Sequence, residues 1–195
     1  AVVSYQTAFL KYYYPVEYMA ALMTSVIHNP SKVAEYILSS RKMQIEILPP
    51  DINFGESEFS ADHGAIRYGL SAIKSLGAPM IRAIVEERNE NGKYQSLRDF
   101  IERMSGRELN KRAIENLIKA GALDQVAGNR RQKLMVYAEI VDAVNQEKKN
   151  AMTGQMSLFD LISDEEKEAY EIQMPKVEEY SKEELLSFEK EVLGV

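Results

Sequence analysis

Two short stretches of this 195-residue sequence carry residue types that can hold phosphate groups. Residues 72–78 and 117–123 each end a short helical pattern with a lysine and then turn through a glycine between small or apolar residues. A glycine permits a tight turn and lets the backbone approach a ligand closely. A helix that follows such a turn offers unpaired N–H groups and the positive end of its dipole, which suit a phosphate. The pattern is that of a helix-hairpin-helix and predicts phosphate contacts without sequence preference.

The residues expected to contact phosphate lie at the two turns and at the start of the helix before the second turn. They are Lys74, Ser75, Leu76, Gly77, Ala78, Lys111, Arg112, Lys119, Ala120, Gly121 and Ala122. Ser75 stands where the fuller helix-hairpin-helix pattern often has an earlier glycine. Helix–glycine–helix corners are also ordinary packing turns, and a single copy would favour that alternative. Two copies about 45 residues apart in one basic segment favour phosphate binding.

The charge of the chain is unevenly distributed along the sequence. The net charge of −6 divides into −3 for residues 1–66, +6 for residues 67–133 and −9 for residues 134–195. Taken as a whole, an acidic chain argues against a polyanionic partner, whereas the middle segment argues for one. On charge alone, a chance cluster of surface lysines and arginines is an equally good explanation. Any polyanion contact is therefore expected in the middle segment.

Several classes of chemistry are excluded by composition. The chain has no cysteine and only two histidines, His28 and His63, so disulfides, thiolate nucleophiles and histidine-rich metal centres are not expected. No Asp-x-Asp pair, phosphate-binding glycine loop or Gly-x-Ser-x-Gly motif occurs. We therefore expect no catalytic residue, metal site or cofactor in this chain. No apolar run is long enough to span a bilayer, and no signal peptide is apparent.

The elements that must position these residues are mostly helical. Hydrophobic periodicity and capping residues predict helices over residues 1–14, 16–27, 30–43, 70–75, 79–89, 97–104, 111–119 and 130–149. Asn29, Ser96 and Asn110 are expected N-caps, and Ser181 opens a capping box before a last short helix. Residues 44–48 alternate as a short strand, and residues 58–68 predict a hairpin that turns at Asp-His-Gly. The fold class is therefore mostly α, with tandem helix-hairpin-helix elements and a minor short β hairpin.

A short linear motif lies in the polar segment that follows the basic one. Gln155, Met156, Ser157, Leu158 and Phe159 match the pentapeptide by which bacterial proteins bind the sliding clamp. A few large apolar residues in linker composition are typical of a docking peptide. The alternative is that Leu158 and Phe159 belong to one turn of a helix docked on the same chain.

Several blocks of sequence, in order, resemble one protein family. Residues 1–11, 14–22, 48–53, 66–74 and 109–112 are similar to the α subunits of bacterial DNA polymerase III, the C-family replicative polymerases. The resemblance covers essentially the whole chain, and residues 155–159 fall where that family carries its internal clamp-binding motif. The sequence begins and ends within apparent elements, which suggests a piece of a larger protein.

The resemblance implies a domain organisation and a set of partners. Residues 1–66 would be the end of the fingers domain, 67–149 the tandem helix-hairpin-helix clamp-binding domain, 150–180 a linker with the clamp motif, and 181–195 the lead-in to an OB-fold domain. The expected partners are double-stranded DNA, the sliding clamp (β subunit) and other polymerase III holoenzyme subunits, in the bacterial cytoplasm and without a membrane. The catalytic palm and its Mg²⁺ ions would lie upstream of residue 1. The parent would be a DNA-directed DNA polymerase, and this fragment alone should be inactive.

Two other functions stay open at this point. The chain could be a stand-alone helix-hairpin-helix DNA-binding module of a repair protein, or a protein-interaction scaffold whose hairpins are only structural. A large exposed apolar surface over residues 1–27 would favour the polymerase fragment over the stand-alone module.

Overall fold

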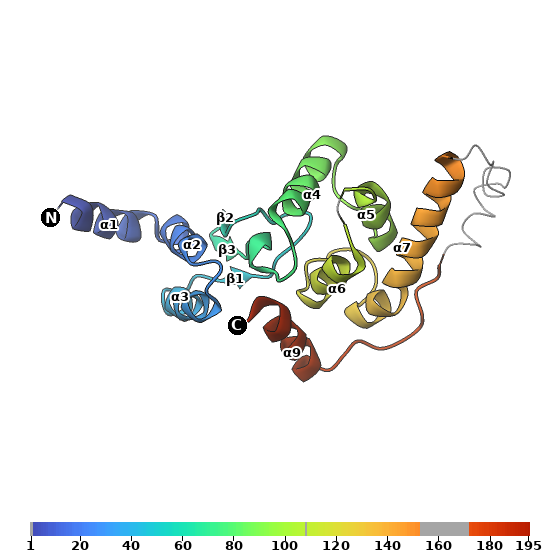
Figure 1. Ribbon diagram of the computed structural model, residues 1–195. Helices are drawn as coiled ribbons and strands as arrows, with labels where there is room; N and C mark the ends of the chain where they lie inside the picture. Colours follow the sequence, from blue (N-terminus) through green and yellow to red (C-terminus); the bar gives the residue numbers. More distant parts are fainter. Residues whose placement is uncertain (1, 108, 153–171) are drawn as a thin grey trace.

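The chain is mostly helical, as the sequence predicts. The computed structural model describes residues 2–107, 109–152 and 172–195 (Figure 1). A 3₁₀ helix, η1, covers Leu70–Ala72. The α-helices are α1 (Val2–Tyr13), α2 (Pro15–Ser25), α3 (Pro30–Lys42), α4 (Ala78–Asn91), α5 (Leu97–Met104), α6 (Lys111–Lys119), α7 (Arg130–Met152) and α9 (Lys182–Leu193).

The predicted N-caps are confirmed by their hydrogen bonds. The side chains of Asn29, Ser96 and Asn110 each accept a hydrogen bond from a backbone N–H three residues later, at 3.3, 3.0 and 2.9 Å. Ser181 and Glu184 form the reciprocal capping box at the start of α9. Each cap satisfies an N–H group that has no partner within its own helix. These local signals explain why helix starts were predicted to within a residue or so.

The small sheet contains the predicted hairpin and one additional pairing. β2 (Ser60–Asp62) and β3 (Ala65–Arg67) are antiparallel, and His63 and Gly64 form the turn with φ of 50° and 85°. β1 is shorter than the expected strand and covers only Ile47–Leu48. Gln44, where the strand was expected to begin, has a left-handed φ of 60° and is not extended. β1 pairs in parallel with β3, so the strand order is β1-β3-β2. The division expected between residues 66 and 67 stays a prediction, and β3 runs across it.

The prediction of a helix over residues 70–75 is wrong for the second half of that range. η1 ends at Ala72, Ile73 has extended backbone, and Ser75 adopts a left-handed φ of 66°. A left-handed residue cannot continue a right-handed helix. The chain therefore reaches the first hairpin turn through an irregular segment.

α7 packs against both α5 and α6, and the second hairpin turn lies between α6 and α7 (Figure 1). α5 and α6 each bury one apolar face, formed by Leu97, Phe100, Ile101 and Met104 of α5 and by Ala113, Ile114, Leu117 and Ile118 of α6. Lys133 of α7 is fully buried, and its Nζ donates hydrogen bonds to the carbonyl oxygens of Leu123 at 2.7 Å and Val126 at 3.0 Å. These bonds fix the loop between the second hairpin turn and α7.

Candidate nucleic-acid interface

The two predicted hairpin turns lie side by side. The Asn116 Nδ2 atom in α6 donates a 2.7 Å hydrogen bond to the carbonyl oxygen of Lys74 in the first turn. Lys74 Nζ donates to the backbone oxygen of Glu191 at 2.6 Å, and Lys119 Nζ lies 3.0 Å from the carboxylate of the same Glu191. Two lysines that are 45 residues apart in sequence therefore meet at one surface. No spacing pattern in the sequence singled out Asn116 or Glu191.

The first turn is built differently from the expectation. Ser75 is the left-handed residue, whereas Gly77 has ordinary extended backbone with φ of −79° and ψ of 151°. Gly77 is the N-cap of α4 and provides no side-chain cap, so the first turn of α4 has no side-chain acceptor there. A β-carbon on Gly77 would meet only Pro79 Cδ, at 3.7 Å. Ser75, Gly77 and Ala78 are exposed and Leu76 is half-buried, so most of this turn faces solvent.

The second turn does require its glycine. Gly121 has φ of 81°, and a β-carbon there would overlap the Arg130 guanidinium and lie 2.9 Å from Asp124 Oδ2. Ala120 and Ala122 are fully buried. The carbonyl oxygen of Ala122 accepts a 2.9 Å hydrogen bond from the backbone N–H of Ile52. The two alanines therefore act here as packing residues, and the exposed chemistry of this turn comes from its neighbours.

Arg130 organises the region around the second turn. Its guanidinium donates to the Lys119 carbonyl oxygen at 3.1 Å, to Asp124 at 2.7 Å and to Glu189 of α9 at 2.9 Å. Burial alone would lower the pKa of Arg130, but the carboxylates of Asp124 and Glu189 outweigh it and raise the pKa. Arg130 is thus a charged, buried residue that joins the second turn to α9.

The N-terminus of α7 is already occupied by a carboxylate. Glu179 accepts hydrogen bonds from the backbone N–H groups of Arg130 at 2.8 Å and Arg131 at 3.1 Å. Burial would raise the pKa of Glu179, but these N–H groups and that of Tyr180 hold it below its usual value. The sequence predicted that this helix start would be open to phosphate, and the structure places an intramolecular anion there.

Lys111 and Arg112 lie at the opposite end of α6 from Lys119. Lys111 Nζ forms a 2.7 Å ion pair with Asp142 of α7, and Arg112 is exposed. The structure therefore brings Lys74 and Lys119 together but leaves Lys111 and Arg112 one helix length away.

The motif Gln155–Phe159 lies outside the described residues. Within the described ranges, no group of three histidine or acidic side chains is placed to hold a metal ion. In the same part of the chain, no helix has the length and apolar character needed to cross a bilayer.

Comparison with known proteins finds one family of motif and several relatives. Residues 44–133, which include both hairpin turns, match the family described as the helix-hairpin-helix motif. The whole chain is 39% identical over 194 residues to DNA polymerase III subunit alpha of Borreliella burgdorferi, of which it covers 17%. The subunits of Thermus aquaticus and Mycobacterium tuberculosis are 48% identical over 124 residues and 40% identical over 152 residues, and the chain covers 10% and 13% of them. In each case 64% to 100% of this chain is matched.

These matches confirm the resemblance predicted from the sequence: the chain is similar, from end to end, to part of the α subunit of DNA polymerase III. The matched part is a small fraction of each relative.

Proposed function

We propose that this chain binds the backbone of duplex DNA through its paired hairpin turns, as a non-catalytic part of a replicative DNA polymerase. The observation that carries the proposal is the contact between Asn116 and Lys74, because it places Lys74 and Lys119 on one surface. The family match over residues 44–133 and the names of the relatives support it. Contacts from lysines and turn amides to phosphates carry no sequence information. Binding without sequence preference would suit an enzyme that must move along any template.

The polymerase activity itself would reside elsewhere in the parent protein. By resemblance, the parent would be a DNA-directed DNA polymerase whose palm holds Mg²⁺, and this chain would bind the duplex.

α1 supports the interpretation as part of a polymerase over that as a stand-alone repair module. It has no buried residue and exposes seven large apolar or aromatic side chains, namely Val2, Val3, Tyr5, Phe9, Leu10, Tyr12 and Tyr13. An apolar surface of that kind is typical of an interface with further protein.

Replacing Lys74 and Lys119 together by glutamine tests the DNA proposal. We expect duplex affinity to fall by roughly tenfold at low salt and the slope of log K against log salt to become shallower by about two, because two phosphate contacts are lost. Fluorescence anisotropy with a labelled duplex measures both quantities. The matched control is Lys11→Gln with Lys42→Gln, which removes equal charge from exposed positions on α1 and α3. Equal affinity for the two double variants would contradict the proposal.

We also propose that residues 155–159 tether the chain to the sliding clamp. The support is the match of this segment to the clamp-binding pentapeptide and its position in a polar stretch. A tether to a ring that encircles DNA keeps the local polymerase concentration high after each dissociation, which gives processive synthesis. Other holoenzyme subunits would be reached through the rest of the parent chain.

For the tether, Leu158→Ala with Phe159→Ala should weaken clamp binding by at least about a hundredfold, because both apolar anchors of the peptide are lost. Isothermal titration of the purified clamp into the chain measures the affinity. Leu161→Ala with Ile162→Ala is the matched control, since it removes similar apolar volume just outside the pentapeptide. Clamp affinity that is unchanged in the first variant, or lowered equally in both, would refute the assignment.

A further inference from the structure

The C-terminal segment of residues 172–195, here called the acidic strap, lies across the second hairpin turn and the start of α7. α9, the helical part of the strap, packs on α6 and lies close to the small sheet (Figure 1). Its carboxylates contact cations and N–H groups that could otherwise contact phosphate, although Lys119 also pairs with Glu115 at 2.9 Å and Arg130 with Asp124 at 2.7 Å. Glu179 accepts from the first two backbone N–H groups of α7, Glu189 pairs with Arg130 at 2.9 Å, and Glu191 pairs with Lys119 at 3.0 Å.

The acidic strap also engages the first hairpin turn. The backbone N–H of Lys74 donates to the carbonyl oxygen of Val192 at 3.0 Å, and Lys74 Nζ donates to the carbonyl oxygen of Glu191 at 2.6 Å. Both lysines at the paired turns are therefore held by one segment. A carboxylate offers two acceptor oxygens to N–H donors, as a phosphodiester does. The carboxylates of the strap therefore accept from the same kinds of donor that a DNA backbone would contact.

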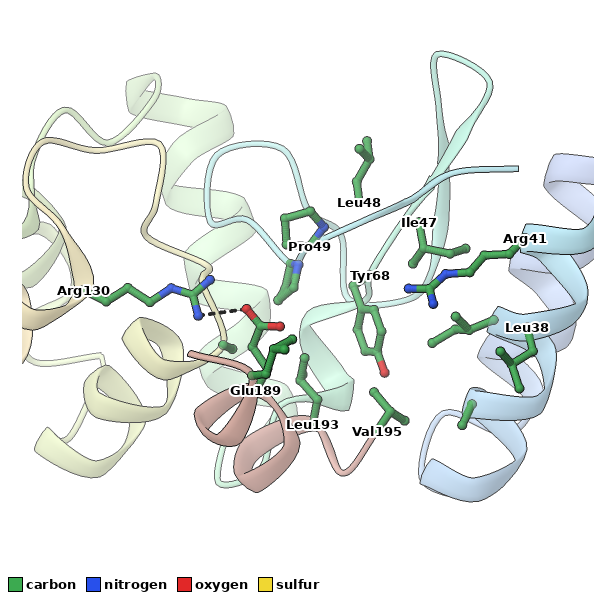
Figure 2. A pocket seen from close by; sticks show the side chains of 15 residues that line it. Leu38, Arg41, Ile47, Leu48, Pro49, Tyr68, Arg130, Glu189, Leu193 and Val195 are labelled. Carbon is green, nitrogen blue, oxygen red and sulfur yellow. Dashed lines mark hydrogen bonds and ion pairs between the residues drawn. The ribbon is translucent and has the colours of Figure 1, made fainter. Parts of the chain in front are cut away.

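The buried apolar side chains of α9 are concentrated at its C-terminal end. Only Val192 and Leu193 of this helix are buried, and Leu186 is 54% exposed. A cavity of about 550 Å³ lies between α9 and the surface formed by α3 and β1, as Figure 2 shows, with Leu38 on one side and Leu193 and Glu189 on the other. The cavity is partly open to solvent and separates this side of α9 from α3 and β1.

The cavity contains an unsatisfied polar group. The Tyr68 hydroxyl points into it and has no hydrogen-bond partner among the described residues, although Tyr68 is only 4% exposed. Burial raises the pKa of this hydroxyl, so it remains a proton donor. A buried donor without an acceptor destabilises the arrangement that buries it. α9 is thus held by the buried side chains of Val192 and Leu193 together with polar contacts, and an incoming phosphate backbone could replace the polar ones.

We propose that the acidic strap is an intramolecular competitor of DNA, and that duplex binding at the second hairpin turn requires Glu179, Glu189 and Glu191 to release their partners. The inference rests on the proposed DNA-binding function. A tethered competitor acts at high effective concentration, so it weakens binding without any other change in the site. The hydrogen bonds from Asn129 to Val177 at 3.0 Å and from Gln132 to Pro175 at 2.8 Å are independent of these carboxylates. They would keep the strap attached while its carboxylates are displaced.

The decisive variant replaces Glu179, Glu189 and Glu191 by glutamine. We expect it to bind a labelled duplex roughly tenfold more tightly than the unmodified chain, with a steeper salt slope, because Lys119 and Arg130 each lose a strap carboxylate and keep only Glu115 and Asp124 as acidic partners. The control is Glu17→Gln with Glu46→Gln and Glu90→Gln, which removes the same charge from exposed positions outside the strap. A general gain from lower negative charge would appear equally in both variants, and that result would overturn the proposal. Weaker binding by the strap variant would overturn it too, since the carboxylates would then be positioning the cations.

A second measurement uses the unmodified chain, so it does not depend on the folding of the variant. Backbone amides of residues 182–193 should exchange with solvent faster when duplex DNA is added, because α9 loses its contacts. Unchanged protection in the DNA complex would contradict the proposal.

The outcomes also distinguish failure of the strap proposal from failure of the DNA-binding proposal. Loss of binding in the Lys74→Gln, Lys119→Gln variant together with no effect of the strap variant would overturn only the strap. An absence of duplex binding in every variant at low salt would overturn both.

Discussion

Arg130→Met should lower the free energy of unfolding by about 3 kcal/mol, because it breaks a buried ion pair network and leaves its partners behind. Only 8% of the Arg130 side chain is exposed, and it hydrogen-bonds Asp124, Glu189 and the Lys119 carbonyl oxygen. Methionine keeps most of the apolar stem but donates no hydrogen bond. Asp124 and Glu189 are partly exposed, at 39% and 33%, so water can reach them and limit the loss. Urea denaturation followed by circular dichroism measures the change.

The control for this variant is the next residue. Arg131 is exposed, and its side chain contacts only the Tyr180 ring among the partners described, with its guanidinium carbon 5.7 Å from the ring centre. Arg131→Met should therefore change the free energy of unfolding by no more than about 0.5 kcal/mol. Similar losses in the two variants would show that Arg130 contributes through general helix charge and not through its network.

Gly121→Ala should destabilise the fold by about 3 kcal/mol, through two separable effects. An alanine with φ near 81° lies in the left-handed region, which costs about 1–2 kcal/mol. The new β-carbon would also displace the Arg130 guanidinium from Asp124, since it would overlap the first and lie 2.9 Å from the second. Thermal or urea unfolding gives the total loss.

A second glycine separates the two effects. Gly64 in the hairpin between β2 and β3 has a similar φ of 85°, but a β-carbon there meets nothing within 4 Å. Gly64→Ala should therefore show the backbone effect alone, about 1–2 kcal/mol. If both substitutions cost the same, the close approach at Gly121 has no energetic weight and the packing described around Arg130 is wrong.

Local chemistry explains what could be predicted from the sequence. The caps at Asn29, Ser96, Asn110 and Ser181 act over three residues, so the residues that form them are visible in the sequence. The hairpin of residues 58–68 was likewise predictable, because its turn residues and apolar positions are adjacent. By the same argument, both helices flanking the second hairpin turn were placed correctly at their starts.

Long-range contacts explain what could not be predicted. The parallel pairing of Ile47 with Ile66 joins residues 19 positions apart, and no turn signal announces it. The sequence predicts that Gly77 permits the first tight turn, whereas the left-handed residue of that turn is Ser75, two positions earlier. Glu179 and Glu191 look like ordinary solvated acids in a charged tail, and only the folded chain shows their contacts with the hairpin turns and α7.

The hydrogen bond between Asn116 and Lys74 has a consequence for how a polymer would be held. It joins the two hairpin turns directly, so they would contact a polymer as one unit. When one turn reaches a phosphate, the other is already at a fixed offset along the same strand or its complement. The second contact then forms with little further loss of rotational freedom, as in a chelate. Two contacts at a fixed spacing would bind a double helix, whose phosphates are regularly spaced, more tightly than a flexible single strand.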